Sequence, residues 1–338
     1  MQRPIARRTA LLASAALLAL TAARGAHAAD PLEKLTVAGW SKPITEITHL
    51  LVEPDKGFFK ANGIDLAYVP GAGGADAIRN ILTGQADVAF TDPGAFFAAL
   101  DKGEKLRAIY DIYPQNVFNV VSLKSANISK PADLKGKKIG VYSLSSGTRQ
   151  NLLVLLHQAG LSESDVTIVV TGLLNFAPLL QGQVDATAAT DTGLLVGRHK
   201  GIGDVNVMEV RNYLNVSSDL FVVREEVYQQ KKPLLKRFLK AYRESAAWMI
   251  ANPDEAAGLA VKYAIDGTDR ATNLEVIRLR NAASVSANTE RNGLGAFDLE
   301  ALQRAADAYR KLGLIEHEIK IKDVVGTDLL PSRSRSTP

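Results

Sequence analysis

The chain has 338 residues, with 40 Lys and Arg against 36 Asp and Glu, and it contains no cysteine. The missing cysteines exclude disulfides, thiolate metal sites and cysteine nucleophiles. A chain of this length predicts about two domains with substantial hydrophobic cores.

The first 28 residues are typical of a secretory signal peptide. Arginines precede an apolar run from Thr9 to Ala23, and the small residues at 26–28 suit cleavage. Arg7-Arg8 leaves both the general secretory route and the twin-arginine route open. Cleavage after Ala28 would leave 310 residues with 36 basic and 36 acidic side chains. We therefore expect a soluble periplasmic protein without a lipid anchor, and the neutral charge gives no argument for a nucleic-acid partner.

Strand and helix patterns alternate along the chain. Short apolar or alternating runs predict strands at residues 34–39, 64–69, 87–90, 106–112, 117–123, 138–142, 166–170, 205–210 and 220–223. Helical spacing or helix caps predict helices at about 45–52, before the Asn62-Gly63 cap, after Gly74, after Asp92, from 148 to Gly160, and in the stripes 235–249 and 299–312. In Thr91-Asp92-Pro93 we expect Asp92 to cap the helix and Pro93 to be its first residue.

One short motif occurs twice, about 100 residues apart. Gly84-Gln85-Ala86-Asp87 leads through a short strand to Thr91-Asp92-Pro93-Gly94, and Gly182-Gln183-Val184-Asp185 leads in the same way to Thr190-Asp191-Thr192-Gly193. Two related lobes are the simplest account, with a chance match as the alternative.

The pattern as a whole predicts an α/β protein with the two-lobe fold of periplasmic binding proteins, in which each lobe is a doubly wound sheet. We expect lobe 1 to comprise residues 29–114 and 220–330, lobe 2 to comprise 115–219, and 331–338 to be a disordered polar tail. The two crossings between the lobes would form a two-strand hinge, and a ligand between the lobes would favour closure.

Helix starts that face each other across a cleft predict an anion site, because each presents unpaired N–H groups and a partial positive charge. Our hypothesis places a sulfonate, carboxylate or similar group between the loops 73–75 and 145–148, helped by Arg149. Asp92 and Asp191 would repel an anion, and Asp92 or Asp191 would instead meet a ligand amine or ring N–H. The candidate ligand-binding residues are Trp40, Ser41, Gly73, Gly74, Ala75, Thr91, Asp92, Asn116, Ser145, Ser146, Gly147, Thr148, Arg149, Thr190 and Asp191.

Each candidate also has a purely structural interpretation. The Gly-rich turn would be a tight strand-to-helix connection, since it lacks the phosphate-loop and dinucleotide patterns. Asp92 and Asp191 would be helix caps only, Trp40 a core residue, and Arg149 one half of a surface ion pair. The five histidines are scattered, and neither a nucleophile elbow nor a paired metal-ligand spacing is present. We therefore expect no catalytic residue, metal or cofactor.

Gly57-Phe58-Phe59 followed by Gly63-Ile64-Asp65-Leu66, a Gly-rich turn and the run 83–90 (TGQADVAF) resembles the substrate-binding proteins of bacterial ABC importers. The family is the NMT1/THI5-like one, which handles nitrate, taurine, alkanesulfonates and thiamine pyrimidine precursors, and the resemblance extends more weakly from Leu35 to about Leu314.

The resemblance implies that the chain is a solute-binding monomer that captures a small sulfonate-, carboxylate- or pyrimidine-like molecule and delivers it to a permease and ATPase in the inner membrane. The same fold occurs in a fungal pyrimidine synthase and in menaquinone-pathway dehydratases. The missing cysteines oppose the first of these, and an export signal opposes both. A periplasmic enzyme or a sensor subunit that uses the same cleft remains the competing interpretation.

Overall fold

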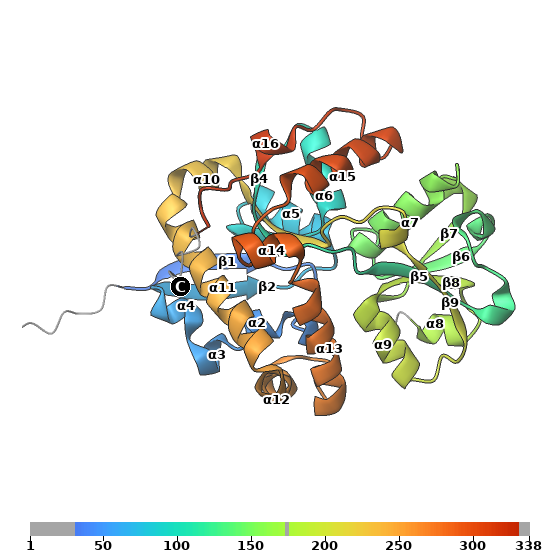
Figure 1. The fold of residues 1–338 in the computed structure, drawn as a ribbon, viewed down its shortest axis with the longest axis horizontal. Coiled ribbons are helices and arrows are strands. Elements are labelled where there is room, and N and C mark those ends of the chain that lie inside the picture. The colour runs from blue at the N-terminus through green and yellow to red at the C-terminus, as the bar shows by residue number, and fades with distance from the viewer. Residues whose placement is uncertain (1–30, 173–175, 331–338) are drawn as a thin grey trace, which may run out of the picture. The chain divides into compact units, whose positions relative to one another are not determined.

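Two five-stranded sheets organise the chain in the computed structural model, which describes residues 31–172 and 176–330 (Figure 1). Both sheets belong to one unit of the chain, which begins at Glu33. The predicted signal peptide and the predicted polar tail lie outside the described residues.

The first sheet has the strand order β2-β1-β3-β10-β4. β1 is parallel to β2 and β3, whereas β10 is antiparallel to β3 and β4. Its strands are β1 (Glu33–Ala38), β2 (Ile64–Val69), β3 (Val88–Thr91), β4 (Leu106–Tyr113) and β10 (Asp219–Arg224).

The second sheet repeats this arrangement in the order β7-β6-β8-β5-β9. β6 is parallel to β7 and β8, and β5 is antiparallel to β8 and β9. Its strands are β5 (Phe118–Leu123), β6 (Lys138–Val141), β7 (Thr167–Val170), β8 (Ala186–Thr190) and β9 (Val205–Glu209).

The chain crosses between the sheets twice, from β4 to β5 and from β9 to β10. In each sheet the strand that follows a crossing pairs antiparallel with its neighbours, so the two sheets have the same topology. We call the first sheet with its helices the first lobe, and the second sheet with its helices the second lobe. The predicted two-lobe α/β fold is thus confirmed.

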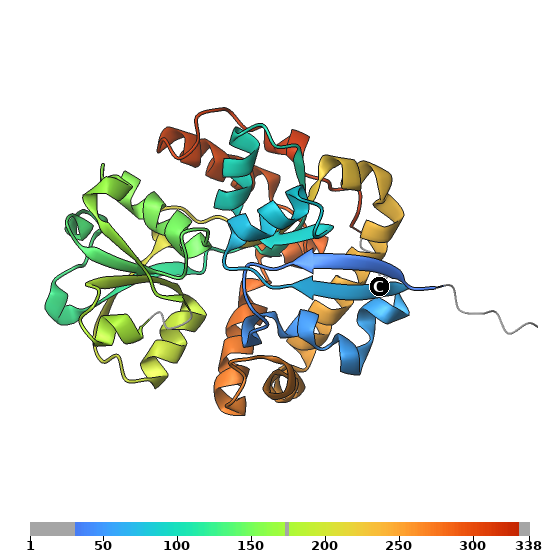
Figure 2. The same cartoon turned by 180° about the vertical axis from the view of Figure 1, so that it is seen from behind.

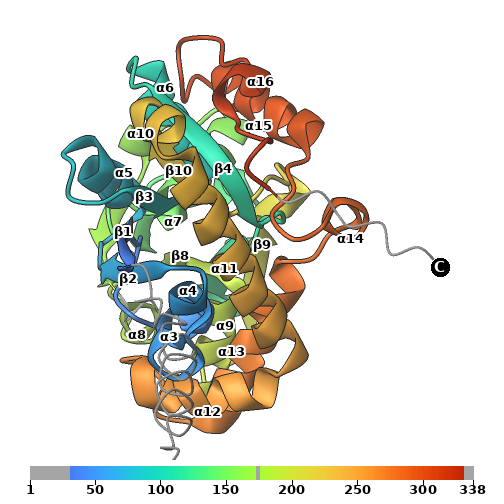
Figure 3. The ribbon, with the colours of Figure 1, turned by 90° about the vertical axis from the view of Figure 1, so that its left-hand side faces the viewer.

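Helices cover both faces of each sheet (Figures 1 and 2), and Figure 3 shows α11 running from α10 to the α12–α13 pair. In the first lobe they are η1 (Thr45–Ile47), α2 (Thr48–Leu51), α3 (Glu53–Lys56), α4 (Phe58–Ala61), α5 (Gly74–Leu82), α6 (Pro93–Asp101), α10 (Glu225–Gln230), α11 (Lys232–Ala251), α12 (Pro253–Tyr263), α13 (Arg270–Ala283), α14 (Ala287–Asn292), α15 (Leu299–Lys311) and α16 (Ile321–Val324). In the second lobe and its connections they are η2 (Lys124–Ala126), η3 (Pro131–Leu134), α7 (Gly147–Gln158), η4 (Glu163–Asp165), α8 (Ala177–Leu180), α9 (Asp191–His199) and η6 (Val210–Asn212).

Helical structure before the Asn62-Gly63 cap is interrupted. Gly57 adopts a left-handed conformation with φ of 65°, so α3 ends there and α4 begins after it. Gly63 has a φ of 73° and closes α4, as the sequence predicts. No helix among the residues at 31–172 and 176–330 has both the length and the apolar character needed to cross a membrane.

The repeated G-Q-x-D motif has the same structural role in both lobes. The Asp87 carboxylate accepts from the Thr36 N–H at 2.9 Å, and the Asp185 carboxylate accepts from the Lys138 N–H at 2.8 Å. Each aspartate thereby holds the strand that follows it against the neighbouring parallel strand, β1 or β6. The repeat supports the equivalence of the two sheets.

Aromatic side chains form the centre of the first lobe. Phe221 on β10 contacts Tyr242 and Phe238 on α11, with ring centroids 4.6 and 5.2 Å apart, and Phe90 on β3 at 5.4 Å. All four are buried, and each buried large side chain of this kind stabilises a fold by roughly 1.5–3 kcal/mol. This core fixes β3 and β10, whose ends reach the site described next.

Candidate functional site

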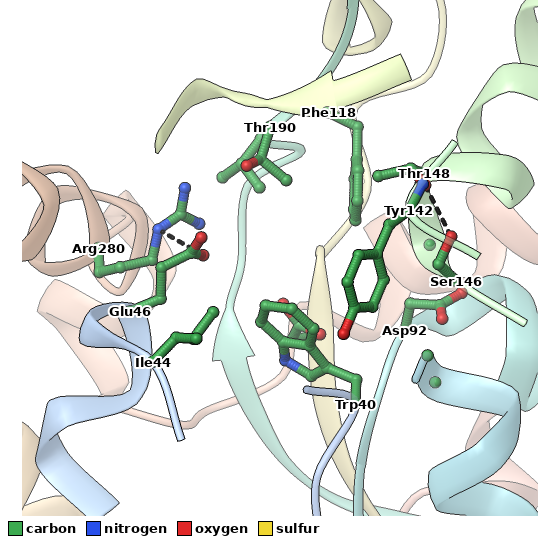
Figure 4. Close-up of a pocket in the computed structure, with 15 residues that line it drawn as sticks. Trp40, Ile44, Glu46, Asp92, Phe118, Tyr142, Ser146, Thr148, Thr190 and Arg280 are labelled. Atoms are coloured by element: carbon green, nitrogen blue, oxygen red, sulfur yellow. Dashed lines mark hydrogen bonds and ion pairs between the residues drawn. The ribbon is translucent and has the colours of Figure 1, made fainter. Parts of the chain in front are cut away.

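A cavity of about 70 Å³ lies where side chains from both lobes meet (Figure 4). Glu46 and Arg280 stand at one end of it, and Asp92, Ser146 and Thr148 stand at the other. The parallel strands β1 and β6 end beside it, which is the sheet edge where ligands bind in open α/β folds.

Eight of the predicted site residues line this cavity. They come from the end of β1, the start of α5, the cap of α6, the start of α7 and the end of β8. These residues are Trp40, Gly73, Gly74, Asp92, Ser146, Gly147, Thr148 and Thr190.

Four predicted residues lie behind the cavity in structural contacts. Ser41 is fully buried and donates to the Lys42 carbonyl at 2.8 Å. Thr91 donates to the Gly74 carbonyl at 2.9 Å and so ties β3 to α5. Asn116 donates to Asn151 and to the Leu214 carbonyl at 2.9 and 3.0 Å, which links the two crossings. The fourth, Arg149, binds the Glu163 carboxylate through Nε at 3.0 Å instead of reaching the cavity.

The loops at 73–75 and 145–148 contact each other directly, which takes up one of the N–H groups that our hypothesis assigned to an anion. The Ala75 N–H, which would have bound the anion, donates to the Ser145 carbonyl at 3.1 Å. Ser145 Oγ also donates to the Ala72 carbonyl at 3.0 Å. Gly73 has a φ of 146°, and a Cβ there would collide with the Ser145 backbone. The two loops therefore close one side of the cavity.

Asp191 differs from the prediction in two respects. The N-cap of α9 is Thr190, whose Oγ1 accepts from the Gly193 N–H at 3.2 Å, and Asp191 is the first helical residue. Its carboxylate forms an ion pair with Arg280. Asp191 is therefore held by the protein and is not among the residues that line the cavity.

Arg280 joins the two lobes at this end of the cavity. Its side chain is 1% exposed, and besides Asp191 it has Glu46 Oε2 at 3.4 Å and Thr192 Oγ1 at 3.4 Å. Thr192 in turn donates to Glu46 Oε1 at 2.8 Å, and the guanidinium lies 5.3 Å from the centre of the Tyr113 ring. Because two carboxylates already neutralise it, Arg280 is a weak receptor for a free anion.

Asp92 is one of the lining residues with an unpaired polar atom. It caps α6, since Oδ1 accepts from the Ala95 N–H at 2.9 Å. Its Oδ2 is buried without a hydrogen-bond partner. Burial raises the pKa of Asp92 to about 6, although the backbone N–H groups of the cap oppose this shift. A ligand N–H donated to Oδ2 would satisfy this atom.

Asp219 adds a second carboxyl group to the same cavity. Burial, followed by the carboxylates of Asp92 and Glu46, raises its pKa well above the usual range. The cavity thus has three carboxyl groups and one guanidinium among its lining residues. Carboxyl oxygens in these positions favour a ligand that carries hydrogen-bond donors.

Aromatic rings line the space between these polar ends. Trp40 and Tyr142 lie edge to face with centroids 6.5 Å apart, and Phe118 lies beside Tyr142 in Figure 4. Trp40 Nε1 is buried without a hydrogen-bond partner. The N–H groups of Gly147 and Thr148 at the start of α7 also meet no acceptor within the described part of the chain. These donors suit a flat ring that bears acceptor atoms as well as donors.

Sequence reasoning missed seven of the lining residues. Tyr142 follows β6 as Trp40 follows β1, so the internal repeat could have revealed it. The others carry no local signal, because they meet only in the folded chain. The missed residues are Ile44, Glu46, Val117, Phe118, Tyr142, Asp219 and Arg280.

No histidine is among the described residues that line this cavity. His49 is buried in the first lobe, where its Nε2 lies 2.7 Å from the Tyr242 hydroxyl, and burial lowers its pKa to about 3. Across the same described residues, no group of His, Asp or Glu side chains is arranged to hold a metal ion.

Known proteins provide an independent comparison. The chain is 23% identical over 319 residues to the riboflavin-binding protein RibY of Chloroflexus aurantiacus. This alignment covers 93% of this chain and 91% of the relative. A putative thiamine biosynthesis protein of Haemophilus influenzae is 26% identical over 278 residues, or 81% of this chain and 85% of that protein.

Among solved structures, the alkanesulfonate-binding protein SsuA from Xanthomonas axonopodis pv. citri bound to MOPS is similar with a TM-score of 0.66. The sequences are 16% identical, and the match covers 88% of this chain and 100% of that one, so this likeness shows the fold alone. The model of the NMT1/THI5-like family matches residues 44–256, which is more than half of the chain. The chain therefore belongs to the NMT1/THI5-like family.

Proposed function

We propose that this protein is the solute-binding component of an ABC importer and that it captures a small flat heterocycle carrying N–H donors. The heterocycle lies in the cavity between the lobes, against Trp40 and Tyr142. It is then delivered unchanged to a membrane permease with its ATPase. Among the solute classes that the family handles, this proposal favours the pyrimidine-like one over sulfonates and carboxylates.

The observation that carries the proposal is Asp92 Oδ2, an acceptor that is buried at the cavity without a partner. A buried acceptor that gains a charge-assisted hydrogen bond from a ligand contributes strongly to affinity, since leaving it unpaired is unfavourable. A sulfonate or carboxylate cannot donate to it. Such an anion would also face Asp219 and Glu46.

The relatives support the same ligand class. One is named as a riboflavin-binding protein and another as a putative thiamine biosynthesis protein. The solved sulfonate-binding neighbour shares the fold at lower identity.

The proposed mode of action follows from the two crossings. We propose lobes of residues 29–114 with 220–330 and of 115–219, which move about the β4–β5 and β9–β10 connections. A ligand held by Trp40 and Asp92 from the first lobe and by Tyr142 from the second contacts both lobes only when they are closed, so binding favours the closed form. We further propose that the chain acts as a monomer in the periplasm after export.

A thermal-shift panel on the purified protein tests this proposal. The panel contains 4-amino-2-methylpyrimidine, cytosine, methanesulfonate, taurine and acetate at pH 7.5. We expect the amino-heterocycles to raise the melting temperature and the anions to leave it unchanged. A rise with methanesulfonate or acetate alone would contradict the ligand class. Chromatography of the bound compound after long incubation separates a carrier, which returns it intact, from an enzyme.

A further inference from the structure

A second and larger cavity adjoins the first. It has a volume of about 490 Å³ and is formed by α8 and α9 of the second lobe and by α13 and the loop before it in the first lobe. We call it the outer groove, and we call the cavity with Trp40 and Asp92 the inner cavity. Ile44 and Glu46 line both spaces, so the two meet at these side chains.

The two spaces differ in volume, and this difference limits which part of a ligand each can hold. Sites for organic ligands usually have volumes of roughly 300–1,000 Å³. The inner cavity, at about 70 Å³, falls below this range and leaves room for no more than one small ring. The outer groove, at about 490 Å³, lies within it.

Most of the polar side chains that line the outer groove are already engaged by the protein, whereas Lys200 is exposed and would pair only weakly with an anion in water. Asp266 accepts from the N–H and the hydroxyl of Thr45 at 2.8 and 2.9 Å. Asp269 caps α13, and Asn273 donates to the Gly267 carbonyl at 3.1 Å. His199 lies 3.5 Å from Glu275. A polar substituent in the groove would lose its water without gaining these groups as partners.

Apolar side chains from both lobes face the same space. Leu180 on α8 is 45% exposed, and Val196 on α9 is half-buried. Val276 on α13 and Ile44 contribute from the first lobe. An apolar group placed here would remove the exposed surface of Leu180 and Val196 from water and would gain about 0.8 kcal/mol for each buried methylene.

The ion pair of Arg280 limits the route between the two spaces. Arg280 lines the inner cavity, and its partner Thr192 lines the outer groove. Separating Arg280 from Asp191 would leave buried charges unpaired, which is unfavourable by several kcal/mol. A substituent that leaves this pair intact would have to pass Ile44 and Glu46, the two side chains that line both spaces.

We infer that the solute has two parts: a donor-bearing ring in the inner cavity, and an uncharged apolar substituent that extends past Ile44 and Glu46 into the outer groove. This inference rests on the proposed function, because it needs the ring to occupy the inner cavity. It names the outer groove as a second subsite, which selects among ring compounds by their substituent.

Calorimetric titration of a matched series tests the inference. The probes are 4-amino-2-methylpyrimidine, its derivatives with a butyl group at C5 or at C6, and the corresponding derivatives whose chain ends in a carboxylate. We expect one butyl derivative to bind at least about 20-fold more tightly than the parent ring, since its methylenes become buried. We expect the carboxylate chain to give no such gain.

Two variants test whether the gain in affinity from the butyl group arises in the outer groove. Val196→Trp fills the outer groove, and Leu180→Asp places a charge on its exposed rim, where the fold tolerates one. In both variants the affinity for the butyl derivative should fall to within about threefold of the affinity for the parent ring. The affinity for the parent ring should stay constant. Val170→Trp is the matched control, because Val170 is 57% exposed on β7 and is not a groove residue. It should retain the full gain.

The possible failures are distinguishable. If the parent ring binds and the butyl group adds nothing, or if the gain survives in Val196→Trp and Leu180→Asp, the outer groove is not a subsite and the proposed function stands. If neither the parent ring nor any derivative binds, the ligand class fails and this inference is overturned with it.

Discussion

Two helix starts with nearly the same sequence have different roles in this protein. In Thr91-Asp92-Pro93-Gly94 the aspartate caps α6 and leaves Oδ2 without a partner at the cavity. In Thr190-Asp191-Thr192-Gly193 the threonine caps α9, and the aspartate binds Arg280 of the other lobe. The difference shows that a repeated motif fixes the local turn, whereas the partners available in the folded chain determine what its carboxylate does.

The physical reason lies partly in one residue. Pro93 has no N–H and begins α6, so Asp92 is the capping residue there. Thr192 stands in the place of Pro93 in the second motif, and its hydroxyl joins the network of Glu46 and Arg280. The following predictions either sharpen this contrast between the two aspartates or remove it.

Replacing Arg280 should have the largest effect. Arg280→Ala leaves Asp191 and Glu46 without their buried cation, and we expect a loss of about 3–5 kcal/mol in the free energy of unfolding. Urea denaturation at pH 7.5 measures this loss. In double-mutant cycles, Arg280→Ala should couple to Asp191→Asn by more than 1 kcal/mol and to Asp92→Asn by less than about 0.5 kcal/mol. Equal coupling to both aspartates would remove the contrast.

Replacing each of the two aspartates with asparagine should change the free energy of unfolding in opposite directions. Asp191→Asn weakens a charge-assisted contact to buried Arg280, and we expect it to lower the free energy of unfolding by about 2 kcal/mol at pH 7.5. Asp92→Asn keeps a capping oxygen and removes a buried charge, so we expect it to raise that free energy by about 1–2 kcal/mol.

Measuring the effect of Asp92→Asn on the free energy of unfolding at two pH values provides the control for this prediction. Because burial raises the pKa of Asp92 from 3.8 to about 6, its stabilising contribution is complete below pH 3.8 and is lost as the pH rises through 6. The gain from Asp92→Asn should therefore vanish near pH 4. A gain of the same size at pH 4 and at pH 7.5 would show that the Asp92 charge is not its cause.

The capping threonine of the second motif should have a smaller effect. Thr190→Ala removes the oxygen that accepts from the Gly193 N–H, and we expect a loss of about 1 kcal/mol. Thr190→Ser keeps this oxygen and should retain most of the stability, which thermal unfolding can measure. If serine and alanine were equally destabilising, the hydroxyl would not be the cap.

Arg149 should matter least. Its ion pair with Glu163 lies at the surface, so Arg149→Ala should change the free energy of unfolding by less than about 1 kcal/mol. Ligand affinity in the thermal-shift assay should stay the same as in the unsubstituted protein. A loss of ligand binding without a loss of stability would indicate that Arg149 contributes to ligand binding.

The fold could be predicted from the sequence because its signals are local. Strand alternation, the glycine cap at Gly63 and the Asp92-Pro93 helix start each depend on a few adjacent residues. Eight of the predicted residues could be placed at the cavity for the same reason, since they lie just after strands or at helix starts. The internal repeat could also have predicted Tyr142, because Tyr142 follows β6 as Trp40 follows β1.

The rest of the site could not be predicted in this way. Glu46, Asp219 and Arg280 lie on three elements far apart in the sequence, and only tertiary packing brings them together. The direct contact between Ala75 and Ser145 is equally invisible to local pattern, and it engages an N–H group that the sequence had assigned to the ligand. The charge of a cavity depends on such long-range partners.

The central claim is that the cavity between the lobes binds a donor-bearing ring through Asp92. Calorimetric titration of 4-amino-2-methylpyrimidine and of methanesulfonate into the purified protein and into Asp92→Asn at pH 7.5 tests it most directly. We predict that the pyrimidine binds the unsubstituted protein and loses at least about tenfold in affinity in Asp92→Asn, while methanesulfonate binds neither. Tight binding of methanesulfonate to the unsubstituted protein, with no effect of Asp92→Asn on the pyrimidine, would contradict the claim.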